Sequence, residues 1–376
     1  MPDLTLAPTL AGDTRTDPAV LRWLEVEPPL PQDLPRPDDR RTAGGLLPDA
    51  IAATEAVDAG AFERALEAAR AEGKAFGITF AVVRDGRLVW AGASGHARDD
   101  GPALTAETPM VIGSVTKTFV AAAVLQLVEE GRLALDDRVR DHLPKLRQLS
   151  RRISVRQLLD HTSGLADLFN DTTRRGLEDE PDHAWTSDEV LRTLHAPWYR
   201  PGEGWAYANT NYYLLGMIVE RISGAPLAEV LTDRFLSPLE LATTRTLTGV
   251  PGDPLEPAWT TIFWASGAMA ASAADLARWG DSLYGDGLLA DASREAMLEV
   301  NDHDYGLGVQ RLKVGRVRGI GHTGLLNTYT TLLFHVPRED VTVALLVNRS
   351  HVDLGAMLRA EPRDGPSLLD LALDRR

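Results

Sequence analysis

The sequence predicts an α+β fold, in which an antiparallel sheet flanked by helices is built from both ends of the chain around an inserted all-helical lobe. The segment ITFAVVRDGRLVWAGASG (78–95) predicts a hairpin with Asp85-Gly86 at its turn. Strand patterns return near the end of the chain, at 305–312, 316–321, 328–336 and 341–349. Between 135 and about 264 the patterns are mostly helical. Because strands and helices do not alternate, a parallel doubly wound sheet is disfavoured.

Helical patterns with recognisable ends support this division. An amphipathic helix is expected at 60–72, stopped by Gly73, and a buried helix from about 114 to 130, ended by Gly131. Further helices are expected at 187–195 after Thr186, at 210–224 up to Gly224, after Pro226, at 272–285 and, as one or two closing helices, within 353–374. The segment VRQLLDHTSGL predicts a short helix ended at Gly164.

The length of 376 residues suits two lobes better than one small core. Residues 1–48 are rich in Pro, Asp and Arg and predict an N-terminal arm or linker. We expect the sheet lobe to comprise 49–117 and 265–376, and the helical lobe to comprise 118–264.

The composition excludes several classes of function. With 54 acidic and 39 basic residues the net charge is −15, which repels a phosphate backbone, so nucleic acid is not expected as a partner. No apolar run reaches the roughly 18 residues of a membrane span. The start of the chain has no basic n-region, which predicts a cytoplasmic location, although a trimmed secreted form would look the same. The chain has no cysteine and therefore no thiol nucleophile.

The first chemical signal is Ser114-Val-Thr-Lys117. A spacing of three residues brings both side chains to one face of a helix. A serine hydroxyl needs an adjacent base, and a lysine can serve when burial depresses its pKa. The chain has only four lysines, and Lys117 is followed by TFVAAAVLQLV, an apolar setting in which an idle charge would be costly. The alternative is a solvated Ser and Lys on a helix surface.

The second signal is Tyr207-Ala-Asn209, between the turn PGEGW and a helix. A tyrosine here can relay a proton between the serine and a leaving group, especially if a nearby lysine lowers its pKa. The Asn209 amide can hold a substrate carbonyl. A core tyrosine with Asn209 as helix N-cap is the alternative.

The third signal is Gly321-His322-Thr323-Gly324, on or beside a predicted edge strand. Glycines let a substrate approach the backbone closely. The N–H of Leu325 and that of Ser114 could then form an oxyanion hole. A turn with a solvated histidine is the alternative.

Together the three motifs, in this order, resemble the active-site elements of class C β-lactamases and their relatives, the serine DD-peptidases and esterases. The segments LLDHTSGL (158–165), YANTNYYLLG (207–216) and ASGAMAASAADLARW (265–279) also resemble that family, and the similarity runs from about residue 60 to about 360. Within the family the sequence is most similar to actinomycete D-alanyl-D-alanine carboxypeptidases and to the esterase-like branch. The resemblance implies a β-lactamase/transpeptidase-like fold with the site between the sheet and the helical lobe.

The resemblance also implies roles. Ser114 is then the acylated nucleophile, with Lys117 and Tyr207 as the proton-transfer pair. Asn209 orients the acyl amide, and His322, Thr323 and Gly324 line the substrate side, with Thr323 near a substrate carboxylate. Leu325 and Ser114 supply the oxyanion hole through their backbones. No metal and no cofactor is expected, because the nine histidines show no metal-binding spacing.

Two departures from the family bear on the substrate. Class C β-lactamases mostly carry lysine where His322 stands. The carboxypeptidases carry an arginine where we align Gln310, and a regular strand would point the adjacent Arg311 the other way. Carboxypeptidase activity is therefore in doubt.

Other residues receive structural interpretations. Gly306-Leu-Gly308 is expected to lie in a strand and His161 to be structural. Asp167 and Asp171 are expected in a solvated loop, with a place at the entrance of the site as the alternative. Trp259, Phe263 and Trp264 are expected either in the core or at the cleft wall.

Three hypotheses for the function follow. The first is a serine hydrolase acting on an ester or amide of a small-molecule or peptide substrate through a Ser114 acyl-enzyme. The second is an acyltransferase or peptide cyclase that uses the same intermediate with an amine or alcohol acceptor. The third is a non-catalytic binding protein. The sequence leaves the oligomeric state open.

Overall fold

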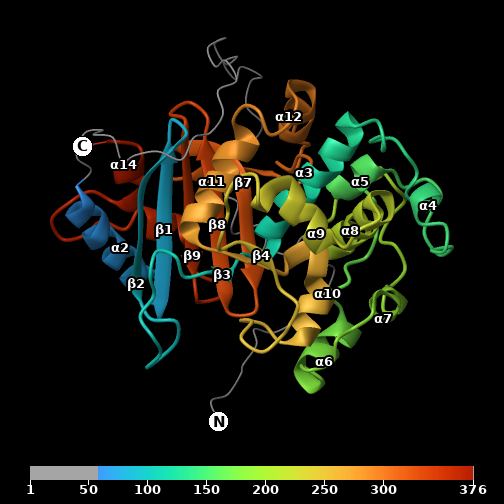
Figure 1. Ribbon diagram of the computed structural model, residues 1–376, viewed down its shortest axis with the longest axis horizontal. Coiled ribbons are helices and arrows are strands. Elements are labelled where there is room, and N and C mark those ends of the chain that lie inside the picture. The colour runs from blue at the N-terminus through green and yellow to red at the C-terminus, as the bar shows by residue number, and fades with distance from the viewer. Residues whose placement is uncertain (1–57, 376) are drawn as a thin grey trace.

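A six-stranded antiparallel sheet forms the centre of the molecule in the computed structural model, which describes residues 58–375 (Figure 1). The predicted arm at 1–48 lies outside these residues. The strand order is β2-β1-β9-β8-β7-β6. The strands are β1 (Gly77–Arg84), β2 (Arg87–Gly95), β6 (Gln310–Val314), β7 (Val317–Leu326), β8 (Tyr329–Val336) and β9 (Val341–Val347). The first hairpin and the C-terminal strands thus meet at the β1–β9 pair, as the sequence predicted.

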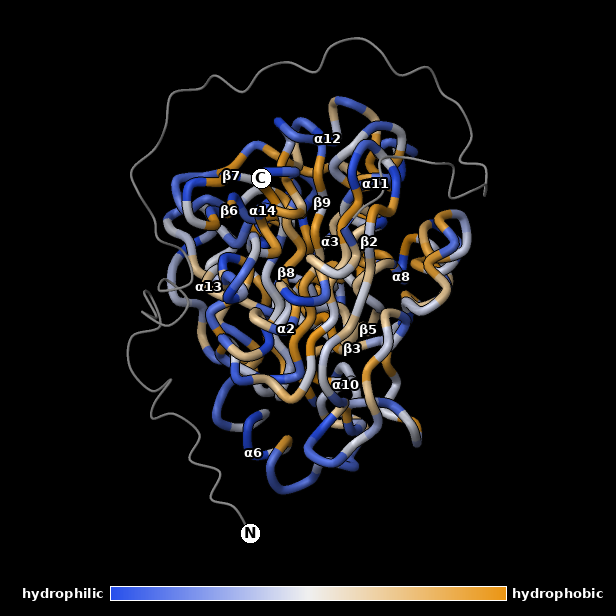
Figure 2. Tube along the Cα trace, turned by 90° about the vertical axis from the view of Figure 1, so that its left-hand side faces the viewer, coloured by the Kyte–Doolittle hydropathy of each residue, from blue (hydrophilic) through white to orange (hydrophobic). Residues whose placement is uncertain are grey.

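The inner strands are apolar on both faces, and this explains their near-continuous hydrophobic sequences. In β9, Val343 and Leu345 belong to the hydrophobic cluster on the outer face, whereas Ala344 and Leu346 belong to the cluster on the inner face. Figure 2 shows this apolar interior along β8 and β9, in contrast to the hydrophilic α6 (Asp171–Asp179) at the surface. Because alternate side chains of a strand point to opposite faces, the same strand contributes to the hydrophobic core on each side of the sheet.

Helices from the two ends of the chain cover the outer face. They are α2 (Ala59–Gly73), α13 (Leu354–Leu358) and α14 (Leu368–Ala372), and α2 packs on β1 and β2. On the inner face α11 (Ala273–Tyr284) packs on β1, β8 and β9. Trp279 of α11 is fully buried, stacks on Phe119 and donates its indole N–H to Thr118 Oγ1 at 2.8 Å.

The remaining helices lie beyond α11 and surround α3 (Thr116–Glu129). They are α4 (Val139–His142), α5 (Val155–Leu159), α6, α7 (Ser187–Arg192), α8 (Asn209–Ser223), α9 (Leu227–Leu231), the π-helical η3 (Thr232–Leu236), α10 (Pro257–Gly267) and α12 (Asp291–Leu298). A small sheet of β3 (Met110–Val111), β5 (Met269–Ala271) and β4 (Arg245–Thr246) links them to the large one. The inner hydrophobic cluster runs from this sheet into α3, α8 and α11 without a break, so the proposed lobe boundaries at 117/118 and 264/265 stay a prediction.

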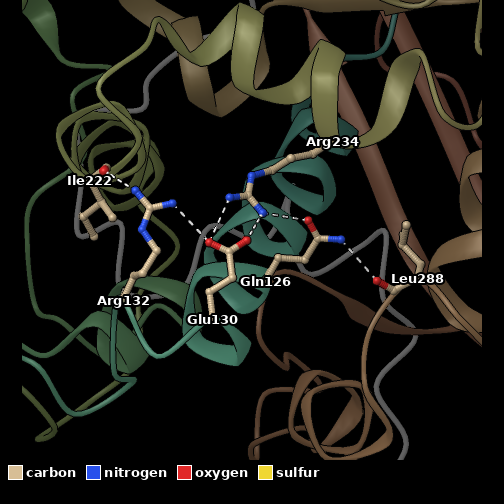
Figure 3. A network of polar contacts seen from close by, with 6 residues as sticks. All are labelled: Gln126, Glu130, Arg132, Ile222, Arg234 and Leu288. Atoms are coloured by element: carbon tan, nitrogen blue, oxygen red, sulfur yellow. Dashed lines mark hydrogen bonds and ion pairs between the residues drawn. The ribbon is translucent and has the colours of Figure 1, made fainter.

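A polar network holds the C-terminal end of α3 (Figure 3). Glu130 accepts hydrogen bonds from Arg234 at 2.6 Å and from Arg132 at 3.1 Å. Arg234 also donates to Gln126 Oε1 at 3.0 Å, and Gln126 donates to the Leu288 carbonyl at 3.2 Å. The network therefore ties α3 to η3 and to the loop before α12.

Two sequence predictions about local structure were wrong. Residues 305–308 form a turn rather than a strand, since Gly308 has φ +84° and the Gly306 N–H bonds to the Val309 carbonyl. The helix at 155–159 ends before Asp160, because His161 has φ +62° and cannot continue it. The motif at 321–324 was expected on or beside an edge strand, and it lies on β7, the neighbour of the edge strand β6. The pairing with β6 covers only 317–321, so residues 322–326 keep a free edge on that side.

Among residues 58–375, no helix combines the length and the apolar character that crossing a bilayer requires.

Candidate active site

Ser114 lies at the N-terminal end of α3, in the 3₁₀ turn η2 (Gly113–Val115). Gly113 has φ +51°, and a Cβ built there would come 2.8 Å from the Leu325 nitrogen. A glycine is therefore required both by the backbone conformation and by the close approach of β7. Ser114 itself is only partly buried, so its hydroxyl can meet a substrate.

Lys117 is fully buried beneath Ser114. Its Nζ contacts Ser114 Oγ at 2.9 Å, Asn209 Oδ1 at 2.8 Å and the Ser266 carbonyl oxygen at 2.7 Å. Burial lowers the pKa of Lys117 to about 7, against the opposing charge of Asp167. A large fraction of this lysine is therefore an uncharged amine near neutral pH, the form in which it can accept the serine proton.

Asn209 opens α8 and stands between Lys117 and a carboxylate. Asp167 Oδ1 accepts from the Asn209 backbone N–H at 2.9 Å, and Asp167 Oδ2 accepts from Asn209 Nδ2 at 3.2 Å. Burial raises the pKa of Asp167 to about 6, although these hydrogen bonds and Lys117 oppose the rise. The expectation of a solvated loop was thus wrong for Asp167, whose carboxylate bonds within the site, and Asp171 is exposed but begins α6 instead of lying in a loop.

Tyr207 lies over Lys117, with Nζ 4.9 Å from the centre of its ring. Its buried hydroxyl forms no well-oriented hydrogen bond within residues 58–375, although the neighbouring Ser114 side chain acts to lower its pKa. Burial dominates and raises the pKa of Tyr207 well above its ordinary value. The condition that a nearby lysine lowers its pKa is therefore not met, and Tyr207 is a neutral phenol.

The strand β7 passes directly against the turn that carries Ser114. A Cβ at Gly324 would come 2.0 Å from the Ile112 carbonyl oxygen and 3.3 Å from the Ser114 nitrogen. This approach brings the backbone beside Leu325 next to that of Ser114, the arrangement that an oxyanion hole of two N–H groups requires.

His322 is buried and neutral. Its Nδ1 faces the Thr323 carbonyl at 2.6 Å, and because a carbonyl only accepts, Nδ1 carries the proton. Nε2 then accepts from the Tyr305 hydroxyl at 2.9 Å. Burial, assisted by Lys117, lowers the pKa of His322 to about 3.

Comparison with known proteins identifies the family at this point. The profile of the family described as Beta-lactamase matches residues 62–362, well over half of the chain. The chain belongs to the β-lactamase family. The predicted family and the predicted fold are both confirmed.

Relatives within the β-lactamase family include enzymes named for D-amino-acid substrates. A D-aminopeptidase of Brucella anthropi is 30% identical over 298 residues, which cover 72% of this chain and 56% of that protein. The chain thus spans about half the length of the curated relatives it matches. The solved structure of a D-stereospecific amidohydrolase from a Streptomyces species has a TM-score of 0.69 at 28% identity, covering 80% of this chain and 97% of that one.

A third relative is the octameric penicillin-binding protein homologue of Pyrococcus abyssi, with a TM-score of 0.68 at 26% identity, covering 85% of this chain and 78% of that one. The predicted serine-hydrolase class agrees with the family and with the names of the D-aminopeptidase and the amidohydrolase.

All eight predicted site residues of this β-lactamase-family chain lie in the region where α3, α8 and β7 meet. Thr323 is held by a residue that the sequence analysis considered only as a departure from the family. Its N–H and its hydroxyl both bond to Gln310 Oε1, at 3.0 and 3.1 Å. Arg311 is exposed, as expected from strand alternation, and pairs with Asp304 at 2.9 Å.

Two further contributors were not expected from the sequence, and a third, His161, was expected only as a structural residue. Asp167 is a carboxylate in the loop after Gly164, but nothing in the sequence indicated its bonds to Asn209. Ser266 acts through a backbone carbonyl, for which no side-chain pattern exists; it follows Trp264, whose φ of +20° interrupts α10 and which packs on Tyr213. His161 is buried as expected, and its Nδ1 accepts from the Ala208 N–H at 3.2 Å, next to Tyr207.

Among residues 58–375, no three His, Asp or Glu side chains cluster in a way that could hold a metal ion. The expectation of a reaction without metal or cofactor stays a prediction.

Proposed function

We propose that the protein is a serine hydrolase that cleaves the amide bond of a D-aminoacyl amide or short peptide through a Ser114 acyl-enzyme. The observation that carries the proposal is the 2.9 Å contact between Ser114 Oγ and the buried Nζ of Lys117, whose pKa lies near 7. A nucleophile with an uncharged amine as its base is the arrangement that serine acyl transfer needs at neutral pH.

In the proposed acylation, Ser114 Oγ bonds to the substrate carbonyl carbon while its proton passes to Lys117 Nζ. The carbonyl oxygen becomes an oxyanion, which the N–H groups of Ser114 and Leu325 stabilise. The C–N bond then breaks, and the leaving amine takes a proton from the Tyr207 hydroxyl, which is reprotonated from Lys117, so that both groups return to their starting forms. In deacylation, water adds to the acyl carbon and gives a proton to Lys117, and Ser114 Oγ takes that proton from Lys117 as its bond to the acyl carbon breaks.

The division of labour within the Lys117–Tyr207 pair follows from the opposite shifts in their pKa values. Tyr207 stays protonated near neutral pH and can donate, whereas Lys117 is the group that can accept. We therefore assign Lys117 as the base toward Ser114 and Tyr207 as the relay to the leaving amine. Asn209 Nδ2 has a second hydrogen, beyond the one given to Asp167, which can bond to the carbonyl oxygen of an acyl amide where a peptide substrate carries one.

The choice of an uncharged leaving group rests on the side chains of β6 and β7 that lie beside the unpaired end of β7. Gln310 and His322 are both buried and uncharged, and the nearest arginine in sequence, Arg311, faces outward to Asp304. A terminal carboxylate would meet no cation among these residues, which favours an amide or amine leaving group over a carboxypeptidase substrate. Preference for a D configuration is supported by the names of the D-aminopeptidase and D-stereospecific amidohydrolase relatives.

The test compares release of p-nitroaniline from D-alanine and L-alanine p-nitroanilides, with Ser114→Ala as control. We expect hydrolysis of the D substrate at least about tenfold faster than of the L substrate, and none by the variant above background. Hydrolysis that survives in Ser114→Ala would overturn the assigned nucleophile, and equal rates on both enantiomers would overturn the D preference. Product analysis in the presence of an added amine separates hydrolysis from acyl transfer, since a transferase would form the new amide in preference to the acid.

A further inference from the structure

We propose that Asp167 is a positioning residue, whose carboxylate fixes the orientation of the Asn209 amide and thereby directs the lone pair of Lys117 at Ser114. This inference rests on the proposed function and assigns a part in it to a residue that does not touch the reacting atoms.

Asp167 determines which end of the Asn209 amide faces Lys117. A carboxylate oxygen only accepts hydrogen bonds, and Asp167 Oδ2 lies 3.2 Å from one end of this amide. That end must therefore be the nitrogen, which leaves Oδ1 facing Lys117 at 2.8 Å. Asp167 Oδ1 is itself anchored by the backbone N–H groups of Asn209 at 2.9 Å and of Phe169 at 3.2 Å, so the carboxylate cannot turn away without losing both bonds.

The two hydrogens of the neutral Lys117 amine have fixed partners. A neutral amine has two N–H bonds and one lone pair. Asn209 Oδ1 and the Ser266 carbonyl oxygen are pure acceptors at 2.8 and 2.7 Å, so they take both hydrogens. The lone pair is then left for the third partner, the Ser114 hydroxyl at 2.9 Å. With the Asn209 amide reversed, its N–H would point at Nζ and compete for that lone pair.

Asp167 also sets the charge around Lys117. The titratable groups that face Lys117 are Asp167 from the loop before α6, Tyr207 and Tyr212 around the start of α8, His161 after α5 and His322 on β7. Burial keeps the two tyrosines protonated and the two histidines neutral. Asp167 therefore supplies the one negative charge in this group, and it opposes the lowering of the Lys117 pKa.

The test compares Asp167→Asn with the matched control Asp171→Asn, an exposed carboxylate four residues along the same segment. An asparagine at 167 has almost the same shape, but it must place its N–H₂ group against the backbone N–H groups or against Asn209 Nδ2. We expect the rate constant of acylation by an activated D-alanyl ester to fall about tenfold or more, because small errors of placement at a nucleophile cost one to two orders of magnitude. We also expect the acid limb of its pH profile to move to lower pH, since the charge that raises the Lys117 pKa is gone. The control should acylate within about twofold of the wild type.

A swap variant, Asp167→Asn with Asn209→Asp, provides a readout that a merely structural role would not move. The amide introduced at position 167 could then accept from the two backbone N–H groups and donate to the carboxylate introduced at position 209. The other oxygen of that carboxylate would accept from Lys117, so each donor again meets an acceptor. We expect the swap to recover part of the lost rate, with an acid limb above that of the wild type, because the negative charge now touches Lys117. This expectation holds even if Asp167→Asn alone does not fold.

The inference is overturned if Asp167→Asn acylates at the wild-type rate with an unchanged acid limb, or if the swap, compared on the plateau above each variant's acid limb, acylates no faster than the single variant. If Asp167→Asn does not fold, a swap variant without acylation overturns it as well. Failure of the wild type to acylate at all, with Ser114→Ala as reference, would instead overturn the proposed function itself.

Discussion

The two ends of α3 hold their charged side chains in opposite ways. At the C-terminal end, Glu130 bonds to Arg234 and Arg132 at the surface, and the hydrogen bond from Arg234 is the main cause that lowers the Glu130 pKa (Figure 3). At the N-terminal end, Lys117 is fully buried and bonds to an uncharged amide, a carbonyl and a hydroxyl, and its pKa falls to about 7.

The difference explains why the N-terminal end of α3, and not its C-terminal end, carries a side chain that can act as a base at neutral pH. A surface ion pair keeps both partners in their ordinary charged states and contributes little to stability. A buried lysine without a carboxylate in direct contact loses most of its preference for the charged form, which costs stability and yields a base at neutral pH. The apolar sequence that follows Lys117 is the cause of its burial.

The largest expected effect comes from removing the buried amine of Lys117. In Lys117→Met the side chain keeps roughly its length but has no lone pair for the Ser114 proton. We expect the acylation rate constant to fall by about 10³-fold or more, as measured by single-turnover mass spectrometry with an activated ester. Circular dichroism should confirm a folded protein. A folded variant that acylates within about tenfold of the wild type would show that Lys117 is not the base.

A smaller effect comes from titrating Lys117 in the wild type. Only the neutral amine can accept the proton, so kcat/KM should fall about tenfold for each unit of pH below about 7 and level off above it. Protonation of Asp167, whose pKa is about 6, should steepen the fall at the acid end. The measurement is kcat/KM for a D-alanine anilide between pH 5 and 9, and an inflection near the ordinary lysine pKa would contradict the burial argument.

The smallest effect is expected at the other end of the helix. Glu130→Gln removes the surface charge pair with Arg234, and we expect the free energy of unfolding to fall by no more than about 1 kcal/mol, with acylation unchanged within about twofold. The lowered pKa of Glu130 means that its contribution is present above the ordinary glutamate pKa and is lost as the pH falls through the folded-state value. Urea unfolding measures the change, with Glu63→Gln, exposed on α2, as the matched control. A loss of several kcal/mol, or of activity, would mean that the network in Figure 3 also positions the site.

Sequence reasoning reached most of the fold because the relevant signals are local. The turn Asp85-Gly86, the N-cap Thr186 and the C-terminal Gly224 each fix the end of an element by their own backbone preferences, and all three stand where they were expected. It failed at 305–308 and at 160–164, where a buried turn and a left-handed His161 depend on neighbours that are distant in the chain.

For the site, the spacing Ser114–Lys117 and the motifs at 207–209 and 322–324 are written in the sequence, because each is held within one turn or one strand. The sequence by itself therefore determined the family, the α+β fold and the candidate nucleophile with its base. The tertiary structure alone decided that Asp167 bonds to Asn209, that Gln310 holds Thr323, and that the pKa of Tyr207 rises while that of Lys117 falls. The physical reason is that a hydrogen-bond partner and a degree of desolvation are set by residues brought together from distant parts of the chain, and no local pattern encodes either.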